Sequence, residues 1–355
     1  MNRLKTLISY VLAASAAAGL AASGQDLQPK GVTYYGGQTA RKLYAPAARA
    51  KQQRTASGVN SGTRSFTQTI TSGGMQRQFI VHIPPNYNSK RATPLVMVFH
   101  GMQMTADMMP PLTLMNVAAD RYGYIVVYPD GYNNSWNDGI QPRAADDVRF
   151  VQDMLGVISH HLNVDQRRIF ACGLSNGGYF SQRLACDLPN RIAAIGVVAA
   201  SALQPICSSC GSNPTPVIYF LGTDDPLVPR DGTGGKSLGK IGDILGLTDL
   251  GVDNLSSVKD VAGILSQQEA VEWWAKHNGA GGAPAVQSMA DSSPRDKCKV
   301  KREVYGAGRR EVDAYIVENG GHTWPGGLPV AGGTLGRTTQ DVNASELMCE
   351  FFRTH

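Results

Sequence analysis

The chain has 355 residues, of which 42% are hydrophobic, and this length can bury one large core with insertions without requiring a second full domain. Its formal net charge is only +5, which is too small to indicate a nucleic-acid-binding protein. Six cysteines are present, a number compatible with disulfide bonds in an exported chain.

The first 23 residues have the pattern of a signal peptide. Arg3 and Lys5 precede an apolar run over 7–22, and small residues at 21–24 offer cleavage sites. We therefore expect a secreted or periplasmic protein, with an uncleaved signal anchor as the alternative. No later apolar run is long enough to cross a bilayer, so no stable membrane insertion is expected after cleavage.

Residues 24–64 are predicted to form a flexible basic leader. No acidic residue occurs between Asp26 and Asp107, whereas lysine and arginine are scattered among small and polar residues in this stretch. We interpret the leader as a solvated linker without a partner. Adhesion to an anionic surface, such as lipopolysaccharide or nucleic acid, is the alternative interpretation.

Strand-like apolar runs follow the leader at 79–83, 95–99 and 125–128. The second run ends in the turn His100-Gly101-Met102-Gln103. We expect the backbone N–H of Met102 to stabilise an oxyanion, with Gly101 allowing close approach. His100 is expected to shape this turn and not to transfer protons. Apolar residues spaced by three and four over 148–162 then predict an amphipathic helix.

The run 168–172 leads directly into Gly173-Leu174-Ser175-Asn176-Gly177, and an apolar helical stretch follows. This is the pattern of a nucleophile elbow, in which the glycines let the backbone crowd together while the serine hydroxyl projects outward. Ser175 is therefore the predicted nucleophile. The backbone N–H of Asn176 is the second predicted donor to the oxyanion.

An acid and a base are predicted after two later strand-like runs. The run 217–221 leads into Asp224 and Asp225, and we prefer Asp225 as the residue that orients the base, with Asp224 in reserve. The run 312–317 leads into a glycine-rich loop that presents His322, the predicted base. The order serine, aspartate, histidine along the chain is that of α/β-hydrolases.

Four motifs together resemble those of the polyhydroxybutyrate (PHB) depolymerase and feruloyl esterase group of α/β-hydrolases. They are HG at 100–101, GLSNGG at 173–178, GTDDPLVP at 222–229 and GGHTWPGG at 320–327, and YPDG at 128–131 and SWNDG at 135–139 fit the same pattern. The resemblance spans residues 65–355. It implies an α/β-hydrolase fold, with a mostly parallel sheet flanked by helices. It also implies acyl transfer by a serine, histidine and aspartate without a metal or cofactor.

An ester substrate is implied, and its identity is left open. Our first interpretation is a PHB depolymerase-type esterase acting on hydroxyalkanoate oligomers or soluble polyester. The alternative is a feruloyl or acetyl-xylan esterase acting on plant polysaccharide esters, and a serine peptidase or a non-catalytic binding protein ranks below both. No separate substrate-binding domain follows His322, so we do not expect attack on insoluble polymer.

Two tryptophans near these motifs are candidate substrate contacts. Trp324, two residues after the predicted base, is expected to wall the acyl or alcohol pocket, and Trp136 is the weaker candidate for the same role. Packing under a loop is the alternative interpretation for both.

Six cysteines allow about fifteen complete pairings. We expect a disulfide from Cys186 to the loop that carries Cys207 and Cys210, and we expect Cys172 to be buried and unreactive.

Residues 231–265 are glycine-rich and then apolar. They are interpreted as a cap insertion near the site, with a surface excursion as the equal alternative. Directly after them, Ser266 and Glu269 form a capping-box pattern that predicts a helix ending near Asn278.

Overall fold

The computed structural model of the protein describes residues 64–139, 145–228, 230, 264–329 and 333–355. The predicted signal peptide, almost all of the leader and almost all of the cap insertion lie outside the described residues. Within these ranges, no helix has the length and hydrophobicity needed to cross a bilayer.

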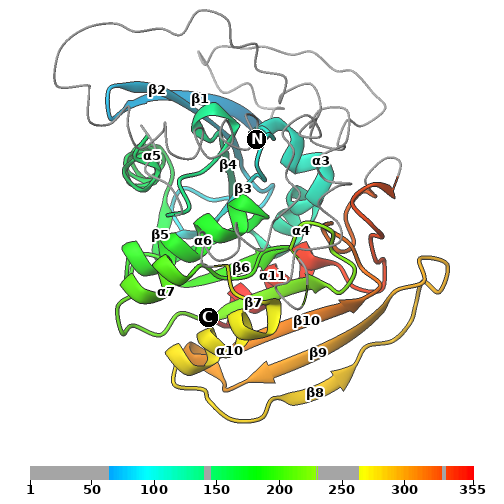
Figure 1. The fold of residues 1–355 in the computed structure, drawn as a ribbon. Helices are drawn as coiled ribbons and strands as arrows, with labels where there is room; N and C mark the ends of the chain where they lie inside the picture. The colour runs from blue at the N-terminus through cyan, green and yellow to red at the C-terminus, as the bar shows by residue number, and fades with distance from the viewer. Residues whose placement is uncertain (1–63, 140–144, 229, 231–263, 330–332) are drawn as a thin grey trace, which may run out of the picture.

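A single sheet of ten strands runs through the described residues in the order β1-β2-β4-β3-β5-β6-β7-β10-β9-β8 (Figure 1). From β4 to β10 in this order, the six neighbouring strands are parallel, whereas β1, β2, β9 and β8 pair antiparallel at the two sides. The strands are β1 (Ser65–Ser72), β2 (Met75–His82), β3 (Thr93–Phe99), β4 (Ile125–Pro129), β5 (Val164–Leu174), β6 (Ala194–Val198), β7 (Val217–Gly222), β8 (Ala285–Ser288), β9 (Lys299–Tyr305) and β10 (Val312–Glu318).

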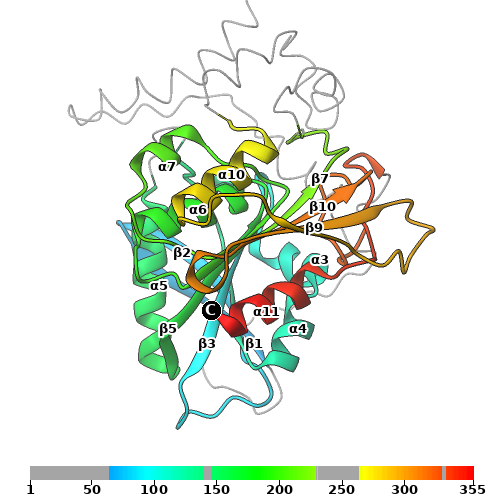
Figure 2. The same cartoon turned by 90° about the horizontal axis from the view of Figure 1, so that it is seen from below.

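Helices cover both faces of this sheet (Figure 2). The α-helices are α3 (Met109–Thr113), α4 (Met115–Tyr122), α5 (Asp147–His161), α6 (Asn176–Asp187), α7 (Gln204–Ser209), α10 (Gln267–His277) and α11 (Ala344–Thr354), and short 3-10 turns are η2 (Ala106–Met108), η3 (Tyr132–Asn134) and η5 (Gly308–Arg310). Helices α5, α6, α7 and α10 lie on one face, and α3, α4 and α11 lie on the other.

Two hydrophobic cores follow from the alternation of side chains along the buried parallel strands. In β3, Met97 packs into the core beneath α5 and α6, whereas its neighbours Val96 and Val98 pack into the core beneath α3, α4 and α11. Helix α10 begins with the predicted capping box, in which Ser266 and Glu269 each bond to the backbone N–H of the other. The strand order and the two helical layers confirm the predicted α/β-hydrolase fold.

The carboxyl ends of the parallel strands lie along one edge of the sheet. Strand β3 ends at Phe99, β5 at Leu174, β7 at Gly222 and β10 at Glu318, and the parallel register brings these ends into line. The HG turn, the elbow and the loops with the predicted acid and base all leave the sheet here. Open parallel sheets bind their ligands at this edge.

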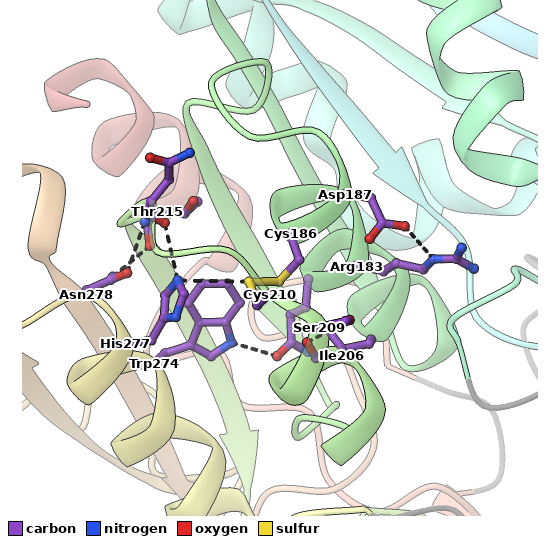
Figure 3. The surroundings of a disulfide bond; sticks show 12 residues. Arg183, Cys186, Asp187, Ile206, Ser209, Cys210, Thr215, Trp274, His277 and Asn278 are labelled. Carbon is purple, nitrogen blue, oxygen red and sulfur yellow. Dashed lines mark hydrogen bonds and ion pairs between the residues drawn. A yellow bond between two sulfur atoms is a disulfide. The ribbon is translucent and has the colours of Figure 1, made fainter.

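One disulfide joins Cys186 of α6 to Cys210 directly after α7 (Figure 3), which confirms the predicted link between this helix and the loop. Cys207 keeps a free thiol that is partly buried, and burial raises its pKa to about 12. Cys172 is fully buried, and burial raises its pKa well above the usual range, so this thiol is unreactive as predicted.

Candidate active site

Residues 173–177 form a sharp strand-to-helix turn between β5 and α6. Ser175 has φ +57° and ψ −121°, a positive-φ backbone conformation that is rare for a residue with a side chain. A Cβ at Gly173 would lie 2.4 Å from the carbonyl oxygen of Gly177, and a Cβ at Gly177 would lie 2.3 Å from that of Phe99. Close backbone approach therefore requires both glycines, and the Ser175 side chain is left partly exposed.

His322 and Asp225 form a buried pair on the loops after β10 and β7. The Nδ1 atom of His322 lies 2.9 Å from Oδ2 and 3.1 Å from Oδ1 of Asp225, and both side chains are almost completely buried. Asp225 Oδ1 also accepts the backbone N–H groups of Leu227 at 2.7 Å and Val228 at 2.8 Å. These bonds fix the carboxyl group and leave His322 Nε2 available to accept a proton.

The structure separates the two predicted acids. The Asp224 side chain is 55% exposed, and its nearest charged partner is the exposed Arg337 at 3.8 Å. Of these two described aspartates, only Asp225 bonds to His322, so the geometry favours the preferred residue over the reserve.

Backbone contacts hold the acid and base loops together. A Cβ at Gly222 would lie 2.4 Å from the carbonyl oxygen of Gly320, and one at Gly321 would lie 2.1 Å from that of Leu335. The N–H of His322 donates to the same Leu335 carbonyl at 2.6 Å. The position of His322 is thus determined by main-chain packing.

Ser175 makes no side-chain hydrogen bond within the described residues, including to His322. One strand, β6, separates the elbow strand from the acid strand, so the two strand ends are about 10 Å apart. Catalytic hydrogen bonds in unliganded enzymes are often long and tighten only in the substrate complex. Ser175 and His322 therefore share one edge of the sheet without yet being engaged.

The two predicted oxyanion donors have free N–H groups beside Ser175. The carbonyl of Ser175 accepts from the N–H groups of Gly178 and Tyr179 at 2.8 and 3.0 Å, so the N–H of Asn176 in the same trans peptide points away from α6. The N–H of Met102 likewise points opposite to the Gly101 carbonyl of the same peptide group, and that carbonyl accepts the N–H of Met104. Neither N–H has an acceptor among the residues that the structure describes.

The HG turn brings Met102 next to the elbow. A Cβ at Gly101 would lie 3.6 Å from the Cβ of Ser175, so the two loops are in contact. The Gly101 carbonyl accepts from the N–H of Met104 at 3.1 Å and from Nδ1 of His100 at 2.8 Å. The geometry can therefore direct two N–H groups at an oxygen bound near Ser175.

Comparison with known proteins shows similarity to a family of esterases. A family model described as "Esterase PHB depolymerase" matches residues 78–211, which include the HG turn and the elbow. NocK, a candidate esterase from Nocardia uniformis subsp. tsuyamanensis, is 26% identical over 296 residues that cover 79% of this chain and 80% of that protein. The chain is similar to the PHB depolymerase and feruloyl esterase family of α/β-hydrolases. It is a carboxylic ester hydrolase.

Other relatives are more distant or much longer than this esterase. Feruloyl esterase B from Piromyces equi is 28% identical over 253 residues, which cover 69% of this chain and 42% of that protein, so this chain spans less than half of its length. The solved acetyl xylan esterase from Aspergillus awamori aligns with a TM-score of 0.49 and 13% identity, over 73% of this chain and 94% of that one. Because this structural similarity is low, the fold is identified from strand order and register.

In this esterase His100 is a structural residue, in agreement with the expectation from sequence. It is completely buried, and its Nε2 accepts the N–H of Gly131 at 2.9 Å. The proton must therefore lie on Nδ1, which donates to the Gly101 carbonyl. Burial lowers the pKa of His100 to about 4, so the ring is neutral at ordinary pH and holds the HG turn in place.

Both tryptophans predicted to contact substrate are core residues of the esterase, and that prediction was wrong. Trp324 is 0% exposed, and its indole Nε1 donates to Ser345 of α11 at 3.1 Å. Trp136 is also 0% exposed, is stacked on Phe180 and donates from Nε1 to the carbonyl of His100 at 3.0 Å. A buried tryptophan with a bonded N–H is a packing residue, and its place in a loop sequence does not reveal this burial.

The contacts of the Asn176 side chain were not predicted from the sequence. Only the backbone N–H of this residue was predicted to act at the site, yet the side-chain amide is buried and bonded to Trp136 and Asp138 in the SWNDG segment. The polar residues of SWNDG were visible as a motif. Nothing in their spacing indicated that they contact the residue after the nucleophile.

Proposed function

We propose that this esterase acts through an acyl-enzyme intermediate formed on Ser175. The observation that carries the proposal is the buried His322–Asp225 pair at the sheet edge where the strained elbow presents Ser175. The free N–H groups of Met102 and Asn176 support it, because a serine hydrolase needs such donors beside its nucleophile.

The reaction then proceeds in two steps. Ser175 Oγ attacks the ester carbonyl while His322 Nε2 takes the hydroxyl proton, and Asp225 stabilises the imidazolium through Nδ1. The N–H groups of Met102 and Asn176 bind the oxyanion. The alcohol leaves with the proton from His322, and water repeats the sequence to release the acid and restore Ser175.

Hydroxyalkanoate oligomers or soluble polyester are the proposed substrates. The match to the PHB depolymerase family over 78–211 supports this class. The similarity to feruloyl esterase B supports the alternative, a feruloyl or acetyl-xylan ester. A single catalytic domain over 65–355 and export of the chain complete the proposal. Export is supported by the N-terminal signal pattern and by the disulfide.

The test compares the mature protein with a Ser175→Ala variant. Initial rates are measured on p-nitrophenyl butyrate, 3-hydroxybutyrate oligomers, methyl ferulate and a matching amide, and circular dichroism checks that the variant is folded. We expect the variant to lose roughly 10⁵-fold or more in kcat, and the preferred wild-type substrate separates the two ester classes. Equal rates for the two proteins would refute the mechanism, and amide turnover as fast as ester turnover would favour a peptidase.

A further inference from the structure

The side chain of Asn176 clamps the segment 135–138, which follows β4. Its Oδ1 accepts the backbone N–H of Trp136 at 2.7 Å, and its Nδ2 donates to the carbonyl of Trp136 at 3.2 Å and to Asp138 Oδ2 at 2.6 Å. A backbone N–H can only donate and a carbonyl can only accept, so these partners fix the orientation of the amide. The acyl-transfer steps described above do not use this side chain.

The segment 135–138 is itself firmly held. Asp147 at the start of α5 accepts the N–H of Asn137 at 2.8 Å and forms a buried ion pair with Arg77 at 2.6 Å. Arg183 of α6 donates to the carbonyl of Asn137 at 2.7 Å. The indole of Trp136 lies in the core. Asn176 is thus bonded to a rigid anchor.

The same segment also contacts the loop with the other predicted donor. The indole N–H of Trp136 donates to the carbonyl of His100, which precedes the peptide group shared by Gly101 and Met102. Residues 131–136 therefore connect both halves of the predicted oxyanion hole, through His100 on one side and Asn176 on the other.

The clamp acts on the peptide group that carries the catalytic N–H. The direction of the Asn176 N–H depends on ψ of Ser175 and φ of Asn176, and Ser175 is in a strained positive-φ conformation that persists only where the surrounding structure enforces it. Because the clamped side chain leaves from the Asn176 Cα, it restricts rotation of this peptide group. Release of the clamp would leave this peptide group held only by the bonds from Gly178 and Tyr179 to the Ser175 carbonyl, so its N–H would be aimed less precisely.

We infer that the Asn176 side chain is a positioning residue for the oxyanion hole, anchored by the segment 135–138. The inference rests on the proposed function, because it requires the Asn176 N–H to bind the oxyanion. The SWNDG motif then holds the Asn176 side chain, which orients the backbone N–H of the same residue. That backbone N–H, and not the side-chain amide, is the donor to the oxyanion.

The chain offers a matched control for an Asn176→Ala variant. Asn278 is 2% exposed, close to the 3% of Asn176, and it clamps one residue in the same way: Oδ1 accepts the N–H of Thr215 at 3.0 Å and Nδ2 donates to its carbonyl at 2.7 Å (Figure 3). Thr215 precedes β7, so this clamp lies at the opposite edge of the sheet. Asn278→Ala therefore removes an equivalent clamp without touching the site.

The experiment measures kcat, KM and the melting temperature of Asn176→Ala, Asn176→Asp and Asn278→Ala on p-nitrophenyl butyrate. Loss of an oxyanion donor costs about 10²–10³ in kcat, and a misdirected donor should cost part of this, roughly 10- to 100-fold, with KM changed less than about threefold. The Asp variant keeps the size of the side chain but replaces its donor by an oxygen facing Asp138, and it should lose activity similarly. Asn278→Ala should lose comparable melting temperature and keep its kcat.

A boronic acid that forms a tetrahedral adduct with the serine provides a second measurement. In Asn176→Ala its Kd should rise by the same factor by which kcat/KM falls, because both depend on the oxyanion donors. Wild-type kcat in a folded Asn176 variant, or an equal loss of kcat in Asn278→Ala, would overturn the inference. These outcomes differ from failure of the proposed function, which would appear as full activity of Ser175→Ala.

Discussion

The substitution Asp225→Asn should inactivate the enzyme by imposing the wrong histidine tautomer. Two backbone N–H groups, from Leu227 and Val228, point at the Oδ1 position, so the amide oxygen of the asparagine must stay there. Its NH₂ group then occupies the Oδ2 position, 2.9 Å from Nδ1 of His322. Nδ1 becomes an acceptor, the ring proton moves to Nε2, and Nε2 can no longer take the proton of Ser175.

The comparable substitution in a serine protease lowers kcat by about 10⁴, or about 5 kcal/mol of transition-state stabilisation. We expect a similar loss here, measured as kcat on p-nitrophenyl butyrate at saturating substrate, with unchanged circular dichroism. Asp224→Asn is the matched control, because Asp224 is 55% exposed and its ion pair is long, and it should keep kcat within about twofold. A loss below tenfold in Asp225→Asn, or equal losses in both variants, would refute the assignment.

Three further predictions concern stability. Gly177→Ala should destabilise the fold by about 3 kcal/mol or more in urea unfolding, because its Cβ would lie 2.3 Å from a backbone oxygen of β3, whereas Gly211→Ala, with nothing within 4 Å, should be nearly neutral. Burial lowers the pKa of His100 from 6.5 to about 4, so between these pH values the unfolded chain binds a proton that the native state excludes. The free energy of unfolding should therefore fall by up to about 3 kcal/mol as the pH drops from 6.5 to about 4. His100→Gln should lack this part of the pH dependence. Replacing Cys186 and Cys210 by serine should cost about 3 kcal/mol, and dithiothreitol should destabilise the wild type but not this variant.

Most of the central strands could be predicted because each is a continuous apolar run. All six predicted runs are strands, and in β3 every residue is buried. Strand β6 (Ala194–Val198) is equally buried but was not predicted from the sequence. Strand β8 (Ala285–Ser288) is exposed throughout, so it has no apolar pattern that a sequence could reveal.

Site residues that follow a parallel strand could be predicted from the sequence. Residues whose position depends on packing against distant segments could not. Ser175, Asp225 and His322 come directly after parallel strands, whose topology brings loops to one edge. The burial of Trp324 depends on contacts with α11, which lies 20 or more residues later in the chain. The role of the Asn176 side chain depends on a segment about 40 residues earlier. The burial and the hydrogen-bond partners of these side chains depend on tertiary contacts that the local sequence does not encode.

The site consists of two halves that different parts of the chain build. Backbone contacts between the loops after β7 and β10 fix Asp225 and His322, whereas the loops after β3, β4 and β5 fix the two N–H donors. Ser175 belongs to the loop after β5, and its hydroxyl is bonded to neither half within the described residues. Because proton transfer requires His322 Nε2 to reach Ser175 Oγ, activity depends on the relative placement of the two halves as much as on either half alone.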